Sequence, residues 1–445
     1  MGLKKTILGG IFALVATSTL GQSGAANNST GPLTGAWVIS ADFFGSLRYF
    51  RLELDQRGDR LTGTLLGAKL GGVVDGGSIR VEGKDAEGNT VEVKGNLEKA
   101  VLSGTVIQTD THNAMHPAEF RFTAILPTQR GTAPPQRHEF TPTVFYREYS
   151  ALNKPVLTVA PGDTIHTTTV DAGGQDEKGI RRVAGGNPET GPFYVETALP
   201  GDTLVVHLTR VRLNRDWAGS DDAIVESALN SSLAVRTKDN GKSIRWHLDL
   251  EKGVATPENA GEDLAHYAVP LMPMMGCIAT AASPGNAAPA TTDSGFFGGN
   301  MDFNEIVEGS TVYLPVQVPG ALLYLGDGHA AMGDGEINGN ALETSMDVEF
   351  TVDVIARQGP HGRRVETPTS MIAMGLDGSL DDAFRSATSS MASWLGEEYM
   401  LTPSEIAEVL GTAAEYKVSE VADRNSGIVL KISKERLKTL ITRAK

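Results

Sequence analysis

Between Gly298 and Asp347 the chain reads GGNMDFNEIVEGSTVYLPVQVPGALLYLGDGHAAMGDGEINGNALETSMD. The apolar positions from Thr311 to Leu325 predict two short strands around a Pro319-Gly320 turn, the second of them ending at Gly326. After this point carboxylates and an imidazole stand among glycines, which allow a backbone to bend sharply and to approach a ligand closely. We therefore expect the chemistry of the protein in this glycine-rich loop.

The loop carries side chains that bind divalent cations. Asp327 and His329 lie in it, and Asp302 precedes the first strand. Carboxylate oxygens and a neutral imidazole nitrogen can form a mixed shell for zinc or another divalent ion, and an open coordination position would lower the pKa of a bound water. A structural interpretation also stands, because Asp-Gly pairs are ordinary turn formers and a lone histidine is often a hydrogen-bonded structural residue.

At these residues the sequence resembles the acetamidase/formamidase family of amidohydrolases. The segments GGNMD, STVYLPVQVPGALLYLGDGHAAMGDGE and ALETSMD carry the resemblance, which runs from about Thr141 to the C-terminus through PVLTVAPGDTI, TGPFYVETALPGDTLVVHL and ETPTSMIAMGLDGSLDDAFRSATSSMASWL. The resemblance implies a metal-assisted hydrolase, built largely from β-structure, that converts small linear amides to a carboxylate and ammonia.

The loop chemistry and the resemblance together give each candidate residue a role. We expect Asp302, Asp327 and His329 to bind a divalent cation, with zinc the first choice, and Glu336 to act as general base. Asp334 is a second candidate catalytic carboxylate. Four further residues are expected to position the substrate or the ligands: Asn300, Glu343, Asp171 and Gln175. The last two belong to a DAGGQ segment that is similar in the family.

Composition narrows the class of function. The 445 residues are 40% hydrophobic and 21% charged, which is ordinary for a globular protein of two or three domains. The net charge of −15, without a Lys/Arg stripe, argues against nucleic-acid binding and mildly against an anionic substrate, so a small neutral amide is the expected partner. The sequence leaves open whether chains associate into a homo-oligomer.

Two other nucleophile chemistries find no support in the sequence. The single cysteine, Cys277, rules out an intrachain disulfide, and nothing near it in the sequence would lower its pKa, so we expect a buried structural thiol. A serine mechanism is unsupported as well, because the chain has no G-x-S-x-G elbow.

The first residues predict export. Residues 1–25 combine a Lys4-Lys5 pair, a short apolar stretch broken by small and polar residues, and small residues at a candidate cleavage site, as in a signal peptide. The alternative is an uncleaved anchor, but the apolar run is shorter than the ~20 residues that a membrane-spanning helix needs. We therefore expect a periplasmic or extracellular protein with no stable membrane insertion after cleavage.

The rest of the N-terminal third predicts a separate β module. Residues 29–127 alternate apolar and polar positions between glycine turns, which is typical of antiparallel strands in a small barrel or sandwich. His112 and His116 have the spacing of a helical metal pair but lie in a loop, so we expect them at the surface. Residues 128–139 are polar and contain a Pro134-Pro135 pair, which indicates a linker, and 140–445 form the predicted hydrolase domain.

Within that domain, strands come first and helices later, a mainly β fold with an α+β C-terminal part. The two Pro-Gly-Asp turns at Asp163 and Asp202 predict paired β-hairpins, with both carboxylates capping their turns. A helix is expected over 380–395 with Ser379 as its cap, and another from Thr402 to Gly411. A final hairpin turns around residues 425–427.

One segment departs from the family. Relatives carry a His- and Trp-containing stretch before the first Pro-Gly-Asp turn, whereas this chain has TVFYREYSALNKPVL, with Tyr146, Arg147 and Tyr149. If that stretch shapes the amide pocket or binds metal in relatives, the chemistry differs here. The rival to an active amidohydrolase is therefore an exported binding or structural protein that keeps the fold without turnover.

Overall fold

The computed structural model describes residues 32–43, 45–127, 134–237, 241–284, 287–356 and 362–440. The signal peptide expected at 1–25, and residues 128–133 of the expected linker, lie outside this part of the chain. Among the described residues, no helix has the length and apolar character needed to cross a bilayer.

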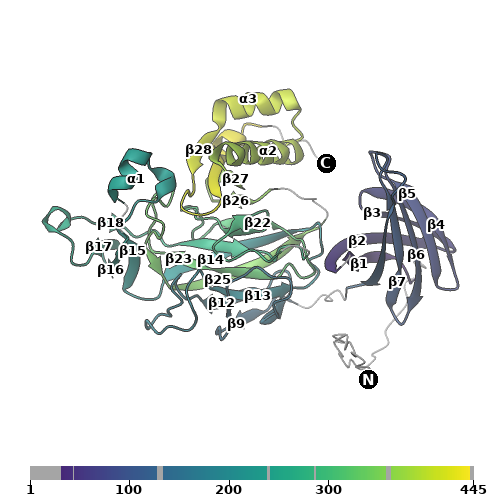
Figure 1. Cartoon of the computed structure of the whole chain (residues 1–445), viewed down its shortest axis with the longest axis horizontal. Coiled ribbons are helices and arrows are strands. Elements are labelled where there is room, and N and C mark those ends of the chain that lie inside the picture. The colour runs from purple at the N-terminus through teal and green to yellow at the C-terminus, as the bar shows by residue number, and fades with distance from the viewer. Residues whose placement is uncertain are drawn as a thin grey trace, which may run out of the picture.

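The N-terminal module is a closed eight-stranded barrel, one of the two forms that the alternation predicted (Figure 1). Its strands are β1 (Gly35–Phe43), β2 (Ser46–Arg57), β3 (Arg60–Leu65), β4 (Ala68–Asp75), β5 (Ser78–Lys84), β6 (Thr90–Glu98), β7 (Val101–Thr109) and β8 (Ala118–Ile125). Closure follows from β1 pairing with both β2 and β8. Alternate side chains such as Trp37, Ile39 and Ala41 fill the interior, because successive strand residues face opposite sides.

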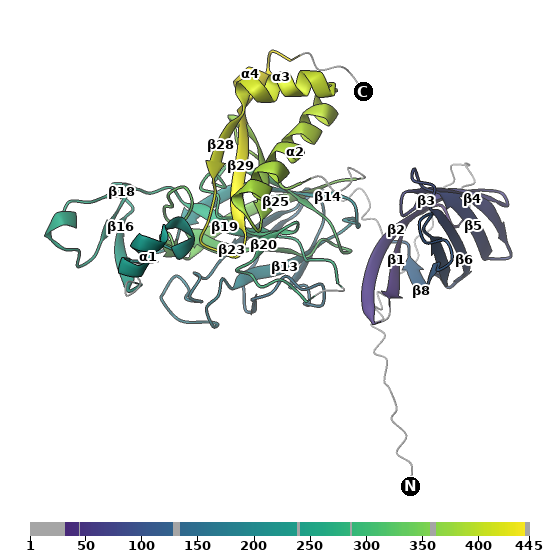
Figure 2. The same cartoon turned by 45° about the horizontal axis from the view of Figure 1, so that its top comes forward.

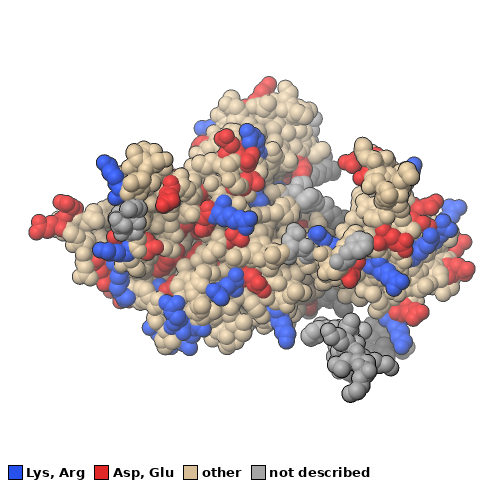
Figure 3. Space-filling view, viewed as in Figure 1, with Lys and Arg blue, Asp and Glu red and all other residues tan. Residues whose placement is uncertain are grey.

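The barrel surface accounts for two further observations. His112 and His116 lie in the turn between β7 and β8, and the His112 side chain is 91% exposed, so the predicted surface position is confirmed. On β2, Arg51 forms an ion pair with Asp202 of the following domain. On the face seen in Figure 3, Lys and Arg side chains are scattered among Asp and Glu and form no continuous stripe.

Two large β-sheets build the rest of the chain. The first has twelve strands: β10 (Phe145–Tyr146), β11 (Leu157–Val159), β13 (Glu189–Val195), β15 (Trp217–Asp221), β16 (Ser243–Asp249), β17 (Val254–Pro257), β18 (Val269–Pro270), β19 (Met274–Ala279), β20 (Ser294–Gly295), β21 (Gly298–Asn300), β23 (Leu323–His329) and β24 (Glu343–Thr344). The second has nine: β9 (Arg137–Glu139), β12 (Thr164–Thr168), β14 (Thr203–Leu213), β22 (Thr311–Pro315), β25 (Met346–Ile355), β26 (Arg364–Glu366), β27 (Ser370–Asp377), β28 (Glu415–Val418) and β29 (Ser426–Ser433).

The main core contains apolar side chains of both sheets. Leu204, Val206 and Phe350 of the nine-stranded sheet belong to one buried cluster with Leu323 and Leu325 of the twelve-stranded sheet. At roughly 25 cal/mol per Å² of apolar surface removed from water, this core dominates the stability of the domain. The mainly β architecture expected from the sequence is thus confirmed.

The two Pro-Gly-Asp turns do not form the predicted hairpins. Each turn leads from a strand of the twelve-stranded sheet to a strand of the nine-stranded one, from β11 to β12 and from β13 to β14. The prediction failed because a tight turn fixes the chain direction and not the partner of the next strand. The capping predictions are confirmed, since Asp163 accepts from the Ala160 amide at 2.9 Å and Asp202 from the Leu199 amide at 3.0 Å.

The C-terminal helices cover one end of the nine-stranded sheet (Figure 2). The longest, α2 (Leu380–Glu398), starts at the predicted cap, where the Ser379 hydroxyl accepts the Asp382 amide at 3.2 Å. The next, α3 (Pro403–Ala413), has the predicted Thr402 capping box and continues two residues beyond Gly411. Short helices complete the list: η1 (Glu226–Ala228), α1 (Ser231–Thr237), η2 (Glu262–Leu264) and α4 (Lys434–Leu437).

The glycine-rich stretch differs from its predicted form in two respects. Strands β22 and β23 lie in different sheets, and β23 continues through the expected loop start at Gly326 as far as His329. It can do so because the glycines fit where side chains could not. A Cβ on Gly328 would lie 2.2 Å from Met346 Cγ, and one on Gly326 would lie 2.6 Å from Glu189 Oε2. The site therefore stands partly on a rigid strand.

Candidate active site

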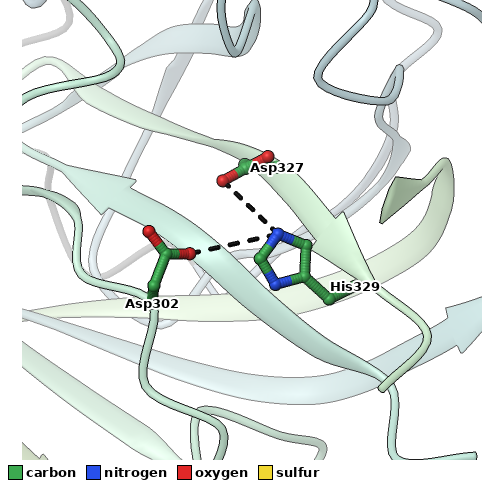
Figure 4. A group of neighbouring side chains, drawn as sticks. All are labelled: Asp302, Asp327 and His329. Carbon is green, nitrogen blue, oxygen red and sulfur yellow. Dashed lines mark ion pairs between the residues drawn. The ribbon is translucent and has the colours of Figure 1, made fainter. Parts of the chain in front are cut away.

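Four carboxylates converge on one imidazole nitrogen. His329 Nε2 lies 3.1 Å from Glu343 Oε1, 3.7 Å from Asp327 Oδ2, 3.9 Å from Glu336 Oε1 and 4.0 Å from Asp302 Oδ1. Figure 4 shows Asp302 and Asp327 approaching the ring from two sides. We call these five residues the acidic cluster. Asp302 precedes β22 in the sequence and the other four residues follow it, so the fold brings together candidates from both sides of this strand.

Local structure explains how the cluster forms. Asp327 and His329 are two residues apart on β23, so the strand period brings both to one face. Glu343 on β24 pairs directly with His329 across the ladder. Asp302 directly follows β21. Strand β19 pairs with β21 on one side and with β23 on the other, so the end of β21 lies near β23. Glu336 is supplied by the turn between β23 and β24.

The backbone of the cluster is strained. Asp302, Asp327 and Glu336 have φ values of +36°, +52° and +45°, and the neighbouring Asn187 has +47°. Left-handed φ is uncommon for residues other than glycine, and such strain concentrates at functional sites. These four are a third of the twelve positive-φ residues other than glycine found in the described part of the chain.

The cluster is buried and short of hydrogen bonds. Asp302 Oδ1, Asp327 Oδ1 and both His329 nitrogens are buried without a hydrogen-bond partner. Burial and the Glu336 and Asp327 carboxylates raise the pKa of Asp302 well above its ordinary value, and burial likewise raises the pKa of Glu336. Burial and Asp327 raise the pKa of Glu343 to about 8. The arrangement is therefore costly unless a positive charge compensates it.

Burial and the neighbouring carboxylates shift the pKa of the His329 imidazole in opposite directions. Burial alone would lower the pKa of His329, but the Glu343 and Asp327 carboxylates outweigh this effect and raise it well above the usual value. A proton on His329 would compensate only one of four carboxylates. A divalent cation would compensate more, which is the physical reason to test the cluster as a metal site.

The residues present fit a divalent cation. Asp302, Asp327 and His329 each offer a ligand atom, all within 4.8 Å of one another, and His329, Glu336 and Glu343 form a second such group. Oxygen and imidazole donors suit zinc and related divalent ions. The space is kept open by Gly276, where a Cβ would lie 2.5 Å from Asp302 Oδ1 and 2.6 Å from Asp327 Oδ2.

Asn300, which the sequence analysis named as a positioning residue, connects the cluster to its surroundings. Its amide nitrogen donates to Asp302 and to Asp423, and its oxygen accepts from Asn187 Nδ2 and Cys277 Sγ, both at 2.7 Å. Asn187 also donates to Asp327 at 3.0 Å. These bonds hold two carboxylates in place.

Several residues of this site were not among the sequence candidates. Asp423 and Asn187 were missed because each lies more than 110 positions from Asn300. Glu189 is fully buried and both of its carboxylate oxygens lack a partner. Burial, followed by the charge of Asp327, raises the pKa of Glu189 well above normal. Cys277 is buried as expected, and it also contacts the site.

Not every predicted residue reaches the cluster. Asp334 is 49% exposed and pairs with Lys417 at 3.2 Å and with Asn304 at 2.8 Å. Asp171 and Gln175 share a loop in which the Asp171 carboxylate accepts the Gln175 amide at 2.8 Å. Asp171 also pairs at 2.7 Å with buried Arg215.

Arg215 links that loop to the cluster. Its guanidinium donates to the Glu343 carbonyl at 3.3 Å and to Thr344 Oγ1 at 2.9 Å, and it stacks on the Trp217 ring at 3.4 Å. Asp171 can therefore influence the β24 backbone through Arg215. No contact of this kind joins Asp334 to the cluster among the described residues.

The departing YREYS segment packs beneath the site. Tyr149 is fully buried, donates to the Thr291 carbonyl at 3.1 Å, and packs on Phe297 and Tyr324. Burial, with smaller contributions from the neighbouring Cys277 and Glu189, raises the pKa of Tyr149 well above normal. The segment therefore contacts Cys277 and lies near Glu189, two buried residues next to the acidic cluster.

Comparison with known proteins identifies the same region. Residues 285–374 match the model of the Acetamidase/Formamidase family. An acetamidase of Mycolicibacterium smegmatis is 44% identical over 59 residues, which are 13% of this chain and 14% of that protein. The chain thus aligns with well under two thirds of this curated relative's length.

Solved structures extend the likeness to about two thirds of the chain. The crystal structure of an acetamidase from Bacillus halodurans is 27% identical, covers 68% of this chain and 99% of its own, and superposes with a TM-score of 0.57. An acetamidase from Yersinia enterocolitica is 25% identical, with coverage of 69% and 94% and a TM-score of 0.60. Roughly a third of this chain lies outside these matches, a share similar to that of the barrel and the residues before it.

Proposed function

We propose that this chain is an amidohydrolase of the acetamidase/formamidase family that converts small linear amides to a carboxylate and ammonia, because residues 285–374 match the family model and solved acetamidases share the fold. The observation that carries the proposal is the convergence of four carboxylates on His329 Nε2 within 4.0 Å, in the segment that matches the family. Buried carboxylates with strongly raised pKa values cluster at functional sites, because there the desolvation cost serves a bound ligand or a reaction.

We assign Asp302, Asp327 and His329 as the residues that would hold a divalent cation, for which zinc fits the donor set. When bound, such a cation supplies Lewis-acid polarisation of the amide carbonyl and a water of lowered pKa. Asn300 and Asn187 then have a clear task, since their amide groups fix the orientation of Asp302 and Asp327.

The proton transfers fall to the remaining carboxylates. Glu336 has a raised pKa and lies 3.9 Å from His329 Nε2, which suits a group that accepts a proton at Oε1 from the attacking water and returns it to the leaving nitrogen. Glu343 Oε1 lies 3.1 Å from the same nitrogen, so it borders the cation site and would position the substrate. Asp334 takes no part in this assignment because its side chain faces Lys417.

Burial limits the size of the substrate. Asp302 and His329 have no exposed surface, and Glu336 is 4% exposed, so only Glu343 and the neighbouring Asp423 are partly open to solvent. Because the acidic cluster is buried, we expect it to accept amides with few heavy atoms. An uncharged amide also avoids the repulsion that four carboxylates would exert on an anion.

Ammonia release from a panel of formamide, acetamide, propionamide and benzamide tests the proposal. We expect turnover to fall as the acyl group grows. Release from none of the amides by protein supplied with zinc, manganese and cobalt in turn would contradict the proposal.

A second candidate function is a binding or structural protein that keeps the fold without turnover. Its support is the placement of Tyr149, which occupies the wall beside Cys277 in the segment that departs from the family. Under this alternative, the acidic cluster would still bind a cation, but no amide would be hydrolysed. The amide panel separates the two candidates.

We also propose export, which rests on the Lys4-Lys5 pair and the apolar stretch within residues 1–25. The mass of the mature protein recovered from fractionated cells tests it. A periplasmic or secreted protein starting beyond residue 20 is expected, and a cell-associated protein of full length would contradict export.

A further inference from the structure

A cavity lies away from the acidic cluster, between α2 and the end of β27. Its volume is about 680 Å³, within the range of small-molecule pockets. It exists because β26 pairs with β27 only from Arg364 to Glu366, which leaves the residues beyond Met374 without a strand on that side. Helix α2 forms one wall and the Gly295–Phe296 segment another.

A buried arginine lines this cavity without a matching anion. Arg363 is 7% exposed, its Nε has no hydrogen-bond partner, and Nη2 donates to the Met374 carbonyl at 3.3 Å. Among the described residues, no carboxylate lies within 4.0 Å of it. Burial lowers the pKa of Arg363 to about 10, although the charge of Asp377 opposes the change. Burying an unpaired guanidinium is costly, so Arg363 favours an anionic group in this cavity.

Hydroxyl groups face the arginine across the cavity. Four serines of α2 follow one another at helical spacing along its wall: Ser386, Ser389, Ser390 and Ser393. Ser390 Oγ is buried and has no partner. Asp377 also lines the cavity, and its carboxylate accepts a hydrogen bond from the Ser386 hydroxyl. Serine hydroxyls and a guanidinium are the donors that carboxylates and phosphates bind.

We propose that this cavity is a binding site for a small organic oxyanion, with Arg363 as the charged donor and Ser390 as a hydroxyl donor. The volume exceeds that of a free inorganic ion, so the ligand carries an organic part beside its carboxylate or phosphate group. The site shares no residue with the acidic cluster, so this proposal goes beyond the amidohydrolase activity proposed above.

The walls of the cavity suggest what binding would change. The Gly295–Phe296 segment leads through β21 to Asn300, and Asn425, which also lines the cavity, lies two residues after Asp423. Asn425 donates to the Ser294 carbonyl at 2.5 Å, which joins the two segments. A ligand that orders them would act on the residues that hold Asp302 in place.

Isothermal titration of the full mature protein with succinate and with glycerol 3-phosphate tests the site and separates carboxylate from phosphate ligands. Arg363→Gln should weaken binding at least tenfold. Arg363→Gln changes a buried residue, so a pair of variants at the exposed Ser393 gives a second test. Ser393→Glu places a negative charge at the cavity and should weaken binding. Ser393→Gln, which is similar in size and uncharged, should not.

Binding of either probe to the wild type, lost in Arg363→Gln or Ser393→Glu and kept in Ser393→Gln, supports the site. Absence of binding by both probes at 10 mM, or equal binding by wild type, Arg363→Gln and Ser393→Glu, overturns it. Ammonia release is measured separately, so failure of this proposal leaves the amidohydrolase proposal standing.

Discussion

Gly276 offers the sharpest test of the cluster geometry, because it has no side chain at the point where Asp302 and Asp327 meet. In Gly276→Ala the new Cβ would lie 2.5 Å from Asp302 Oδ1 and 2.6 Å from Asp327 Oδ2. A carbon and an oxygen pack at roughly 3.3 Å, so both carboxylates must move by about 0.7 Å. Metal sites tolerate ligand displacements of about 0.2 Å.

We therefore expect Gly276→Ala to lose at least 100-fold in metal affinity, which is about 2.8 kcal/mol at 1.4 kcal/mol per factor of ten. Amide turnover should fall with it. Competition against a chromogenic chelator measures the affinity, and circular dichroism checks the fold. The matched control is Gly71→Ala in β4, where a Cβ would meet no atom within 4 Å. Wild-type metal affinity in a folded Gly276→Ala protein would refute the geometry on which the site is built.

Three other predictions concern the pH response, the helices and the catalytic carboxylates. Hydrogen bonds to Glu139 and then Asp347 raise the pKa of His166, so its stabilising effect is complete below about pH 6.5 and is lost as the pH rises through the folded-state pKa. The Tm difference between wild type and His166→Gln should be larger at pH 6 than at pH 9, and the reverse order would contradict the sign. Gly411 lies inside α3 and its Cβ would meet nothing within 4 Å, so Gly411→Ala should raise the free energy of unfolding by ~0.5–1 kcal/mol in denaturant titrations. Glu336→Gln should lower kcat at least 100-fold while Asp334→Asn stays within twofold of wild type, and equal losses would overturn the assignment of the base.

The sequence named the members of the acidic cluster because four of the five lie between positions 327 and 343. Asp327, His329 and Glu336 lie within ten positions, and the glycines around them indicated a sharply bent backbone. The sequence alone could not decide whether Glu336 or Asp334, two positions apart, belongs to the acidic cluster. Only the fold shows that one faces His329 and the other faces Lys417.

Long-range neighbours stayed out of reach for a physical reason. Asn187, Glu189 and Asp423 join the site through pairing of strands that are distant in sequence, and no local pattern marks them. The barrel was predictable because its strands alternate and pair with their sequence neighbours. The Pro-Gly-Asp turns misled because the strands after them joined the other sheet.

The central claim is that the acidic cluster is a metal-dependent amidohydrolase site held by His329. Elemental analysis of purified wild-type and His329→Ala protein, with ammonia release measured on the same samples before and after chelation and metal return, tests it most directly. We expect about one divalent cation per wild-type chain, activity lost on chelation and restored by metal, and neither metal nor activity in folded His329→Ala. Full metal content together with wild-type ammonia release in His329→Ala would contradict it.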